Sequence, residues 1–129
     1  MPPPVQKSGV TNSTLYTREI VRTVRTDPND SGIVALIEVP PSSTFQLVSR
    51  IVGRSGEDRT LSIWYQSTAG KTDSAGSVSI FDITFIHVVN TMVGDVIISD
   101  APSGVQIQVA GDRLVYWTCA ATLYVSQVP

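Results

Sequence analysis

Two side chains in this sequence are of the types that carry out nucleophilic or acid–base chemistry near neutral pH, His87 and Cys119. They are the only histidine and the only cysteine of the chain. Nucleophilic catalysis needs a hydroxyl or thiol beside a base, but His87 alternates with apolar residues near the end of a predicted strand, which indicates a structural or rim residue. Cys119 lies on the apolar face of a later strand, where a thiol behaves as a small inert hydrophobe. We therefore expect no catalytic residues and predict that the protein is not an enzyme.

The acidic residues offer a second kind of chemistry, general acid–base catalysis or metal binding. Glu57 and Asp58 are adjacent, and Asp27 is close to Asp30. Both pairs lie in predicted turns, where short polar side chains make local hydrogen bonds to the backbone. Neither pair matches a calcium-binding loop or a phosphate-cradling glycine motif, and a single cysteine excludes a multi-cysteine zinc site. The sequence predicts no metal ion and no cofactor, but a glycosidase-type carboxylate pair assembled from distant strands stays open.

Exposed aromatic side chains are the remaining candidates, because they serve protein interfaces and sugar stacking alike. Tyr116 and Tyr124 share one face of the predicted strand 114–125. This face is mixed in polarity, and another subunit could cover it. Trp117 lies on the opposite, apolar face and is predicted to be part of the core.

A second aromatic pair, Trp64 and Tyr65, lies earlier in the chain. The segment 67–77 that follows is rich in Gly, Ser, Thr and Ala, which predicts a mobile, exposed loop. Together the pair and the loop could form a platform for a ligand.

The elements that would hold these residues are all predicted to be β-strands. Val, Ile, Ser and Thr are abundant, and 16% of the residues are charged, against about 25% in an average soluble domain. Branching at Cβ suits a pleated surface better than a helix, and turn residues recur at short spacing. The predicted strands span residues 15–25, 33–39, 45–52, 61–65, 78–89, 92–99, 105–109 and 114–125. This pattern is typical of an all-β protein, an antiparallel β-sandwich or jelly roll of about eight strands.

Three of these strands carry more specific expectations. The segment 33–39 is nearly continuous in apolar residues, which predicts a strand covered on both faces. Phe81, Ile83 and Phe85 alternate with other residues and are predicted to share one face. Strand 114–125 keeps its alternation longest, so we expect it to be a long central strand with its fully apolar face in the core.

The N-terminal residues 1–13 differ in composition from the rest of the chain. Pro2, Pro3 and Pro4 cannot donate backbone hydrogen bonds, and they favour extended polyproline geometry. We predict an extended arm here, and a single sandwich domain over residues 14–129. A simply disordered tail is the alternative.

Arg18 and Arg22 are interleaved with apolar residues in the predicted strand 15–25. They could bind an acidic surface of a partner. They could equally form a solvated strand edge that discourages unwanted pairing, and this second interpretation is favoured.

The net charge and the lengths of the apolar runs argue against several classes of protein. A net charge of −2 argues against the electropositive surface that nucleic acid binding needs. No run approaches the ~20 apolar residues of a membrane span, and the N-terminus lacks the apolar region of a signal peptide. We expect synthesis in a cytoplasm. Because the chain is short and begins with Met, we also expect that no fibre shaft precedes the domain.

Two groups of segments, one before and one after the middle of the chain, carry a family resemblance. Residues 48–60 run through a basic residue and a charged turn into an aromatic strand. Residues 105–109 alternate Val, Ile and Val, residues 110–113 form a Gly-containing turn, and a final strand with a tryptophan near its start follows. This pattern, over roughly residues 33–128, resembles small β-sandwich domains in structural proteins of tailed bacteriophages.

The resemblance implies a virion component with no catalytic residues to carry over. Such domains occur as capsid decoration (cement) proteins, head fibres and tail-fibre tips, frequently as homotrimers. The family's turn before the tryptophan strand has a Gly-Lys-Thr-like sequence, whereas this chain has Gly111, Asp112 and Arg113. A function tied to that turn is therefore in doubt.

From these observations we predict a virion-located capsid decoration protein that binds the outer shell and stabilises it. The expected partners are the major capsid protein or other virion proteins, and further copies of the chain itself. The alternative is a tail-fibre or head-fibre tip that binds a host-surface carbohydrate through Trp64 and Tyr65. The residues expected to contact the capsid or another subunit are Pro2, Pro3, Pro4, Arg18, Arg22, Tyr116 and Tyr124.

Overall fold

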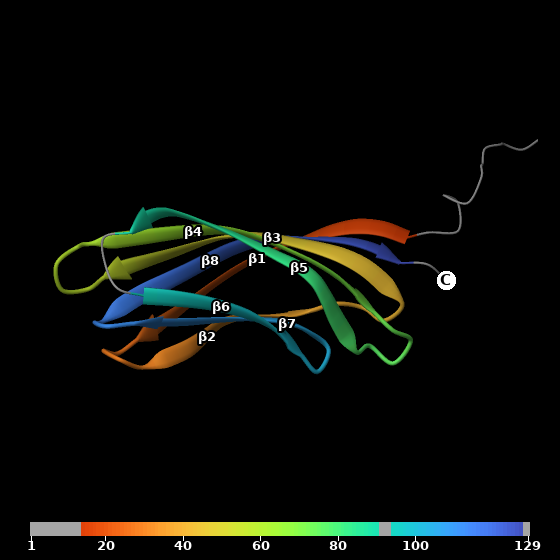
Figure 1. Ribbon diagram of the computed structural model, residues 1–129, viewed down its shortest axis with the longest axis horizontal. Helices are drawn as coiled ribbons and strands as arrows, with labels where there is room; N and C mark the ends of the chain where they lie inside the picture. The colour runs from red at the N-terminus through yellow and green to blue at the C-terminus, as the bar shows by residue number, and fades with distance from the viewer. Residues whose placement is uncertain (1–13, 91–93, 128–129) are drawn as a thin grey trace, which may run out of the picture.

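The computed structural model describes residues 14–90 and 94–127, and these residues form two stacked antiparallel β-sheets (Figure 1). Five strands make a large sheet in the order β1-β8-β3-β4-β5, and three make a small sheet in the order β2-β7-β6. The strands are β1 (Thr14–Thr26), β2 (Ser31–Glu38), β3 (Ser43–Ser55), β4 (Leu61–Thr72), β5 (Val78–Asn90), β6 (Gly94–Ala101), β7 (Gly104–Gly111) and β8 (Val115–Gln127). The predicted all-β sandwich of eight strands is confirmed. None of the described residues forms a helix that could cross a membrane.

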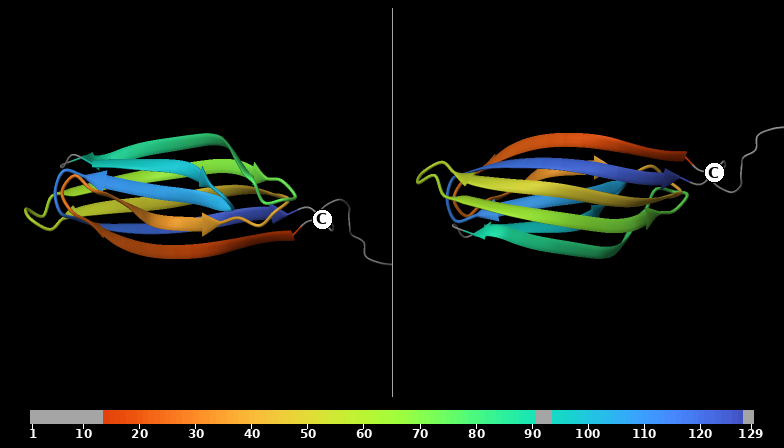
Figure 2. Two further views of the ribbon diagram at one scale, coloured as in Figure 1. Left: turned by 90° about the horizontal axis from the view of Figure 1, so that it is seen from below. Right: turned by 90° about the horizontal axis from the view of Figure 1, so that it is seen from above.

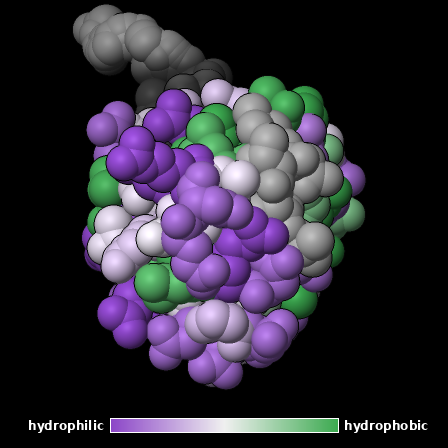
Figure 3. Space-filling view, turned by 90° about the vertical axis from the view of Figure 1, so that its left-hand side faces the viewer, coloured by the Kyte–Doolittle hydropathy of each residue, from purple (hydrophilic) through white to green (hydrophobic). Residues whose placement is uncertain are grey.

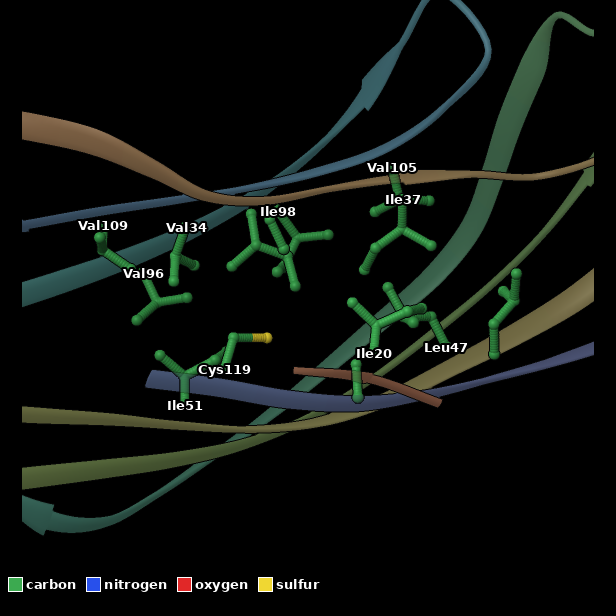
Figure 4. Close-up of a cluster of buried hydrophobic side chains, with 14 of the residues drawn as sticks. Ile20, Val34, Ile37, Leu47, Ile51, Val96, Ile98, Val105, Val109 and Cys119 are labelled. Atoms are coloured by element: carbon green, nitrogen blue, oxygen red, sulfur yellow. The ribbon is translucent and has the colours of Figure 1, made fainter. Parts of the chain in front are cut away.

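The two sheets lie face to face with their strands along the long axis of the molecule, as the two views of Figure 2 show. The core fills the space between them. In Figure 4, Val34 and Ile37 of the small sheet face Leu47 and Ile51 of the large sheet. Burial of these side chains is the main force that holds the layers together.

Strand β8 has the role that its alternation predicts. It lies between β1 and β3 in the large sheet, and every second residue from Val115 to Val125 is buried. Trp117 is fully buried, and its indole Nε1 donates a hydrogen bond of 2.8 Å to the hydroxyl of Thr26 on β1. Strand β8 therefore supplies a continuous row of buried side chains to the core.

Strand β2 differs from its prediction. Its nearly continuous apolar run was expected to be covered on both faces, but Ile33 and Leu36 are exposed. The register against β7 shifts between Ile33 and Ala35, which marks a β-bulge. Because a bulge adds one residue to the strand, Val34 and Ala35 are both buried, and the apolar run reflects this local irregularity.

The expected loop at 67–77 is also corrected, because β4 continues through Thr72. Only a short turn follows, and the carboxylate of Asp73 accepts hydrogen bonds from the backbone N–H groups of Ala75 and Ser77, both at 2.9 Å. Gly76 adopts a φ of +89° in this turn, a conformation that glycine reaches without strain. The small residues before it are cross-strand partners of β3 and β5.

In β5 a second bulge breaks the predicted common face of Phe81, Ile83 and Phe85. The register against β4 shifts between Ala69 and Gly70, so that Phe81 has no direct partner. Its ring instead lies 5.8 Å from Nζ of Lys71. Ile83 and Phe85 do share the face that points toward the core, because they pair with the buried residues Thr68 and Gln66.

Candidate functional site

The tyrosines of β8 lie on the outer face of the large sheet, as predicted. Tyr116 and Tyr124 are both exposed, and they lie on the face of β8 opposite to its row of buried residues. Eight residues of strand separate them, which corresponds to about 26 Å at the usual rise per residue. They therefore belong to different surfaces, one at each end of the sandwich.

Tyr124 borders an open hollow of about 600 Å³, which we call the end hollow. The ends of β1, β3 and β8 form it, with Leu15 and Tyr16 from β1 and Phe45 from β3. Leu15 and Tyr16 are exposed, whereas the side chain of Phe45 is buried on the core face of the sheet, opposite to Tyr124. The predicted arm and its three prolines lie outside the described residues, but β1 begins beside this hollow.

The arginines of β1 lie at the rim between the sheets. Arg18 and Arg22 leave β1 on the face that points toward the core, yet both side chains are exposed. The guanidinium of Arg18 donates a hydrogen bond of 2.9 Å to the backbone carbonyl of Glu38 on β2. That of Arg22 donates to the carbonyl of the adjacent Val21, also at 2.9 Å. Arg18 thus joins the two sheets.

The proposed platform of Trp64 and Tyr65 does not exist in the structure. Trp64 is buried, with its ring stacked on His87 at 4.3 Å and its centroid 5.6 Å from that of Trp117. Tyr65 is exposed on the opposite face of the sheet. Adjacent residues of a strand point to opposite faces, so the two rings cannot bind one ligand together.

His87 and Cys119, the two residues considered for nucleophilic or acid–base chemistry, lie in different environments. His87 is an exposed rim residue at the end of the aromatic stack. Cys119 is fully buried, and burial raises the pKa of its thiol to about 11. The thiol therefore stays neutral at physiological pH, which confirms the prediction of an inert cysteine.

The acidic pair Glu57 and Asp58 belongs to a cluster that joins two turns. Nη1 of Arg113 lies 2.6 Å from the carboxylate of Asp58, and its Nε lies 2.8 Å from that of Asp112. Glu57 accepts a hydrogen bond of 3.1 Å from the backbone N–H of Leu114. These contacts tie the β3–β4 turn to the β7–β8 turn, at the end of the molecule where Figure 3 shows mostly hydrophilic side chains.

The pKa of Asp58 is lowered to about 2, first by the hydrogen bond from the hydroxyl of Thr60 at 2.7 Å. Further hydrogen bonds and the charge of Arg113 act in the same direction. A carboxylate held ionised in this way cannot act as a general acid near neutral pH. Within residues 14–90 and 94–127, no group of three or more acidic, histidine or cysteine side chains is placed to hold a metal ion.

The sequence prediction missed one surface, the free side of β5. Phe81, Ile83, Phe85, Ile86 and Val88 are all exposed. A strand that is apolar on both faces predicts cover on both faces, and here neither face is covered within the described part of the chain. The signal in the sequence is the scarcity of charge, because Asp82 is the only formally charged residue of β5.

Comparisons with known proteins give one fold likeness. No protein-family model and no curated protein matches the chain. Among solved structures, the chain is similar to tailspike protein gp49 from Acinetobacter baumannii bacteriophage Fri1, a capsular polysaccharide depolymerase, with a TM-score of 0.48 and 16% identity. The match covers 95% of this chain, which spans 19% of the length of that tailspike.

This comparison corrects the prediction that the protein is not an enzyme, because the tailspike it found is an enzyme. The prediction rested on isolated residues, and carboxylates can be brought together from distant strands. It is withdrawn. With 16% identity, the likeness carries neither a substrate nor an activity to this chain.

Proposed function

We propose that this protein is a bacteriophage virion protein that decorates the outer shell of a capsid and stabilises it. The observation that carries the proposal is the end hollow, an exposed apolar and aromatic surface beside the start of β1. The expected partner is the major capsid protein. The trimer that the resemblance implies stays a prediction.

The chemistry of the end hollow suits a protein partner. Leu15 and Tyr124 expose apolar surface on the outer face of the large sheet, and the phenol group of Tyr124 can make hydrogen bonds there. Tyrosine has few rotatable bonds, so its immobilisation costs little conformational entropy. Thr44 and Ser126 add small polar groups to the lining. Such a mixture of aromatic and polar groups is typical of protein–protein interfaces.

The strand register places the start of β1 next to the same hollow. Thr14 pairs with Gln127 of β8, and Gln127 also pairs with Ser43 of β3. A partner bound at the end hollow is therefore within reach of residues 1–13, whose three prolines reduce the entropy lost on ordering. Contacts of modest area, repeated at about 25 cal/mol per Å² of apolar surface over a whole shell, add up to a large stabilisation.

A capsid-binding assay with two matched tyrosine variants tests the proposal. Tyr124 and Tyr65 are 46% and 44% exposed on the same face of the large sheet. Tyr124→Ser is expected to weaken co-sedimentation with capsids stripped of the protein by about tenfold or more, as for a central interface aromatic. Tyr65→Ser should bind like the wild type, and deletion of residues 1–13 should also weaken binding. The proposal fails if the wild type does not bind capsids or if only Tyr65→Ser loses binding.

The carbohydrate-binding alternative is left with one member of its aromatic pair. Trp64 lies in the core, so only Tyr65 could stack on a sugar. A glycan-array signal that disappears in Tyr65→Ser and persists in Tyr124→Ser would favour this alternative over shell binding.

A further inference from the structure

The free side of β5 exposes five apolar side chains along one strand of the described residues. Strand β5 is the last strand of the large sheet, and its hydrogen-bonded neighbour in the described part of the chain is β4. We call the exposed side chains of Phe81, Ile83, Phe85, Ile86 and Val88 the β5 edge. They are 36–63% exposed, and none belongs to the end hollow.

Within the described residues, side chains are exposed on both faces of β5. Ile83 and Phe85 point to the core side, yet they are 36% and 40% exposed. Ile86 lies on the outer face, opposite the exposed Tyr65. An edge strand of this kind presents a row of unpaired backbone groups together with apolar side chains, which is a template for another strand.

The opposite edge of the same sheet shows the usual protection against such pairing. Strand β1 carries Arg18, Glu19, Arg22 and Arg25, whereas β5 carries only Asp82. Both strands have 13 residues. Charged side chains are the common means of blocking edge-to-edge association, and β5 lacks them.

We propose that β5 pairs with β5 of a second copy of this chain, antiparallel across a two-fold axis, so that the large sheets of two subunits become continuous. An identical strand is complementary in this arrangement because each partner offers the same backbone edge and the same apolar residues on each face. With the axis near Thr84 and Phe85, Asp82 of one copy lies opposite residue 86 or 88 of the other. The two Asp82 carboxylates are then not placed against each other.

The exposed side chains of the β5 edge supply about half of the area that a standard dimer contact buries on each partner. The five side chains of the β5 edge present roughly 450 Å² of surface, taking about 150–200 Å² for each fully exposed side chain. A standard interface buries about 800 Å² per partner, and the backbone edge and Tyr65 add to the side-chain area. On a typical monomer the largest apolar patch is about 300–600 Å² and is often functional.

This contact is separate from the proposed shell-binding surface. Strands β3 and β4 lie between β8, which carries Tyr124, and β5. The dimer leaves the end hollow of each subunit open, and two hollows on one particle would bind a repetitive shell with higher avidity. The proposal does not depend on shell binding, because it is tested with the purified chain alone.

Sedimentation equilibrium over a concentration series tests the proposal with two matched variants. Ile86 on β5 and Leu36 on β2 are 61% and 60% exposed. The wild type and Leu36→Glu are expected to form dimers, and Ile86→Glu is expected to weaken dimerisation by at least tenfold, because it places a carboxylate beside the partner's apolar strand and Asp82. A far-UV circular dichroism spectrum like that of the wild type shows that the fold of each variant is intact. A wild type that stays monomeric, or a dimer that Ile86→Glu leaves unchanged, overturns the proposal.

Cross-linking tests the geometry. Cys119 is the only cysteine of the chain and is fully buried, so a new surface cysteine is the reactive thiol. Thr84→Cys near the axis should give a covalent dimer with a short bifunctional maleimide. Thr23→Cys, an exposed position on β1, should give none. Equal cross-linking of both variants, or of Thr23→Cys alone, contradicts pairing through β5.

Discussion

Strands β1 and β5 are the two edges of one sheet and have the same length, yet their surfaces are opposite in character. Strand β1 carries four charged residues, and Arg18 donates a hydrogen bond across to β2. Strand β5 carries one, and it exposes phenylalanine, isoleucine and valine on both faces. The contrast indicates that one edge is closed against strand pairing and the other is open to it.

The two edges also differ in how the small sheet covers them. Ile20 of β1 is buried in the core, whereas Ile83 of β5 points to the core side and is still 36% exposed. The large sheet has more strands than the small one, so a strand at its margin can lie outside the core. Edge position and core position are therefore separate properties of a strand.

The largest effect is expected when β1 is made to resemble β5. The double substitution Arg18→Val and Arg22→Val removes two charges from its rim, and each subunit then has two apolar edges. Subunits that associate through both edges can form open-ended assemblies. Static light scattering should therefore show large particles that grow with time. The same double substitution combined with Ile86→Glu should remain small. A protein that keeps the wild-type mass would show that these arginines do not close the β1 edge.

Two isoleucine truncations compare how much the core-side residues of β1 and β5 contribute to stability. Ile20 is 7% exposed and Ile83 is 36% exposed. In the Ile86→Glu background, where association is weakened, Ile20→Ala should lower the free energy of unfolding by about 2–4 kcal/mol. Ile83→Ala should cost about 1 kcal/mol or less, because much of its side chain is already in water. Urea denaturation measures both, and equal losses would show that the small sheet covers β5 as well as β1.

A smaller effect is expected from the hydrogen bond that joins the sheets at β1. Arg18→Met keeps the aliphatic stem and removes the bond to the carbonyl of Glu38, with an expected loss of about 1 kcal/mol in the free energy of unfolding. Arg22→Met is the control, because its guanidinium bonds only to the neighbouring Val21, and it should change stability by less than about 0.5 kcal/mol. The reverse order in denaturant titrations would remove the structural role of Arg18.

The smallest effect concerns the charged turns, away from both edges. The folded pKa of Asp58 is about 2, below the value of 3.8 for the free side chain. The stabilisation is therefore complete above pH 3.8 and is lost as the pH falls toward 2. Asp58→Asn should flatten this part of the stability profile in acid denaturation, and Thr60→Val should do so in part. Parallel profiles for the wild type and Asp58→Asn would contradict the assignment, and the effect is modest because the group is exposed and screened.

Alternation in the sequence was sufficient to identify the main elements of the fold. The face of β8 that carries Trp117 and Cys119 could be assigned to the core, since six successive alternate positions are apolar. The outward position of Tyr116 and Tyr124 followed from the same period. Short polar turns between apolar segments were sufficient to predict eight strands and their sandwich class.

The alternation of residues in β4 did not show which of its two faces points to the core. Trp64 is flanked on its own face by Ser62 and Gln66, and all three are buried. Gln66 satisfies its amide by donating to the hydroxyl of Ser49 at 2.6 Å, so a polar row lies in the core. A sequence with polar residues on one face of β4 gave no reason to place Trp64 inside, and the aromatic platform was wrong for that reason.

The sequence by itself determined the strand pattern, the core face of β8 and the inert cysteine, because these depend on residues close together in the chain. Tertiary structure alone decided that β1 and β5 are edges, that the bulge in β2 buries Val34 and Ala35 together, and that side chains on both faces of β5 are exposed. Whether a strand is covered depends on which other strands reach it, and that is a property of the sheet order. The contrast between a charged edge and an apolar edge therefore becomes visible only when the strands are assembled.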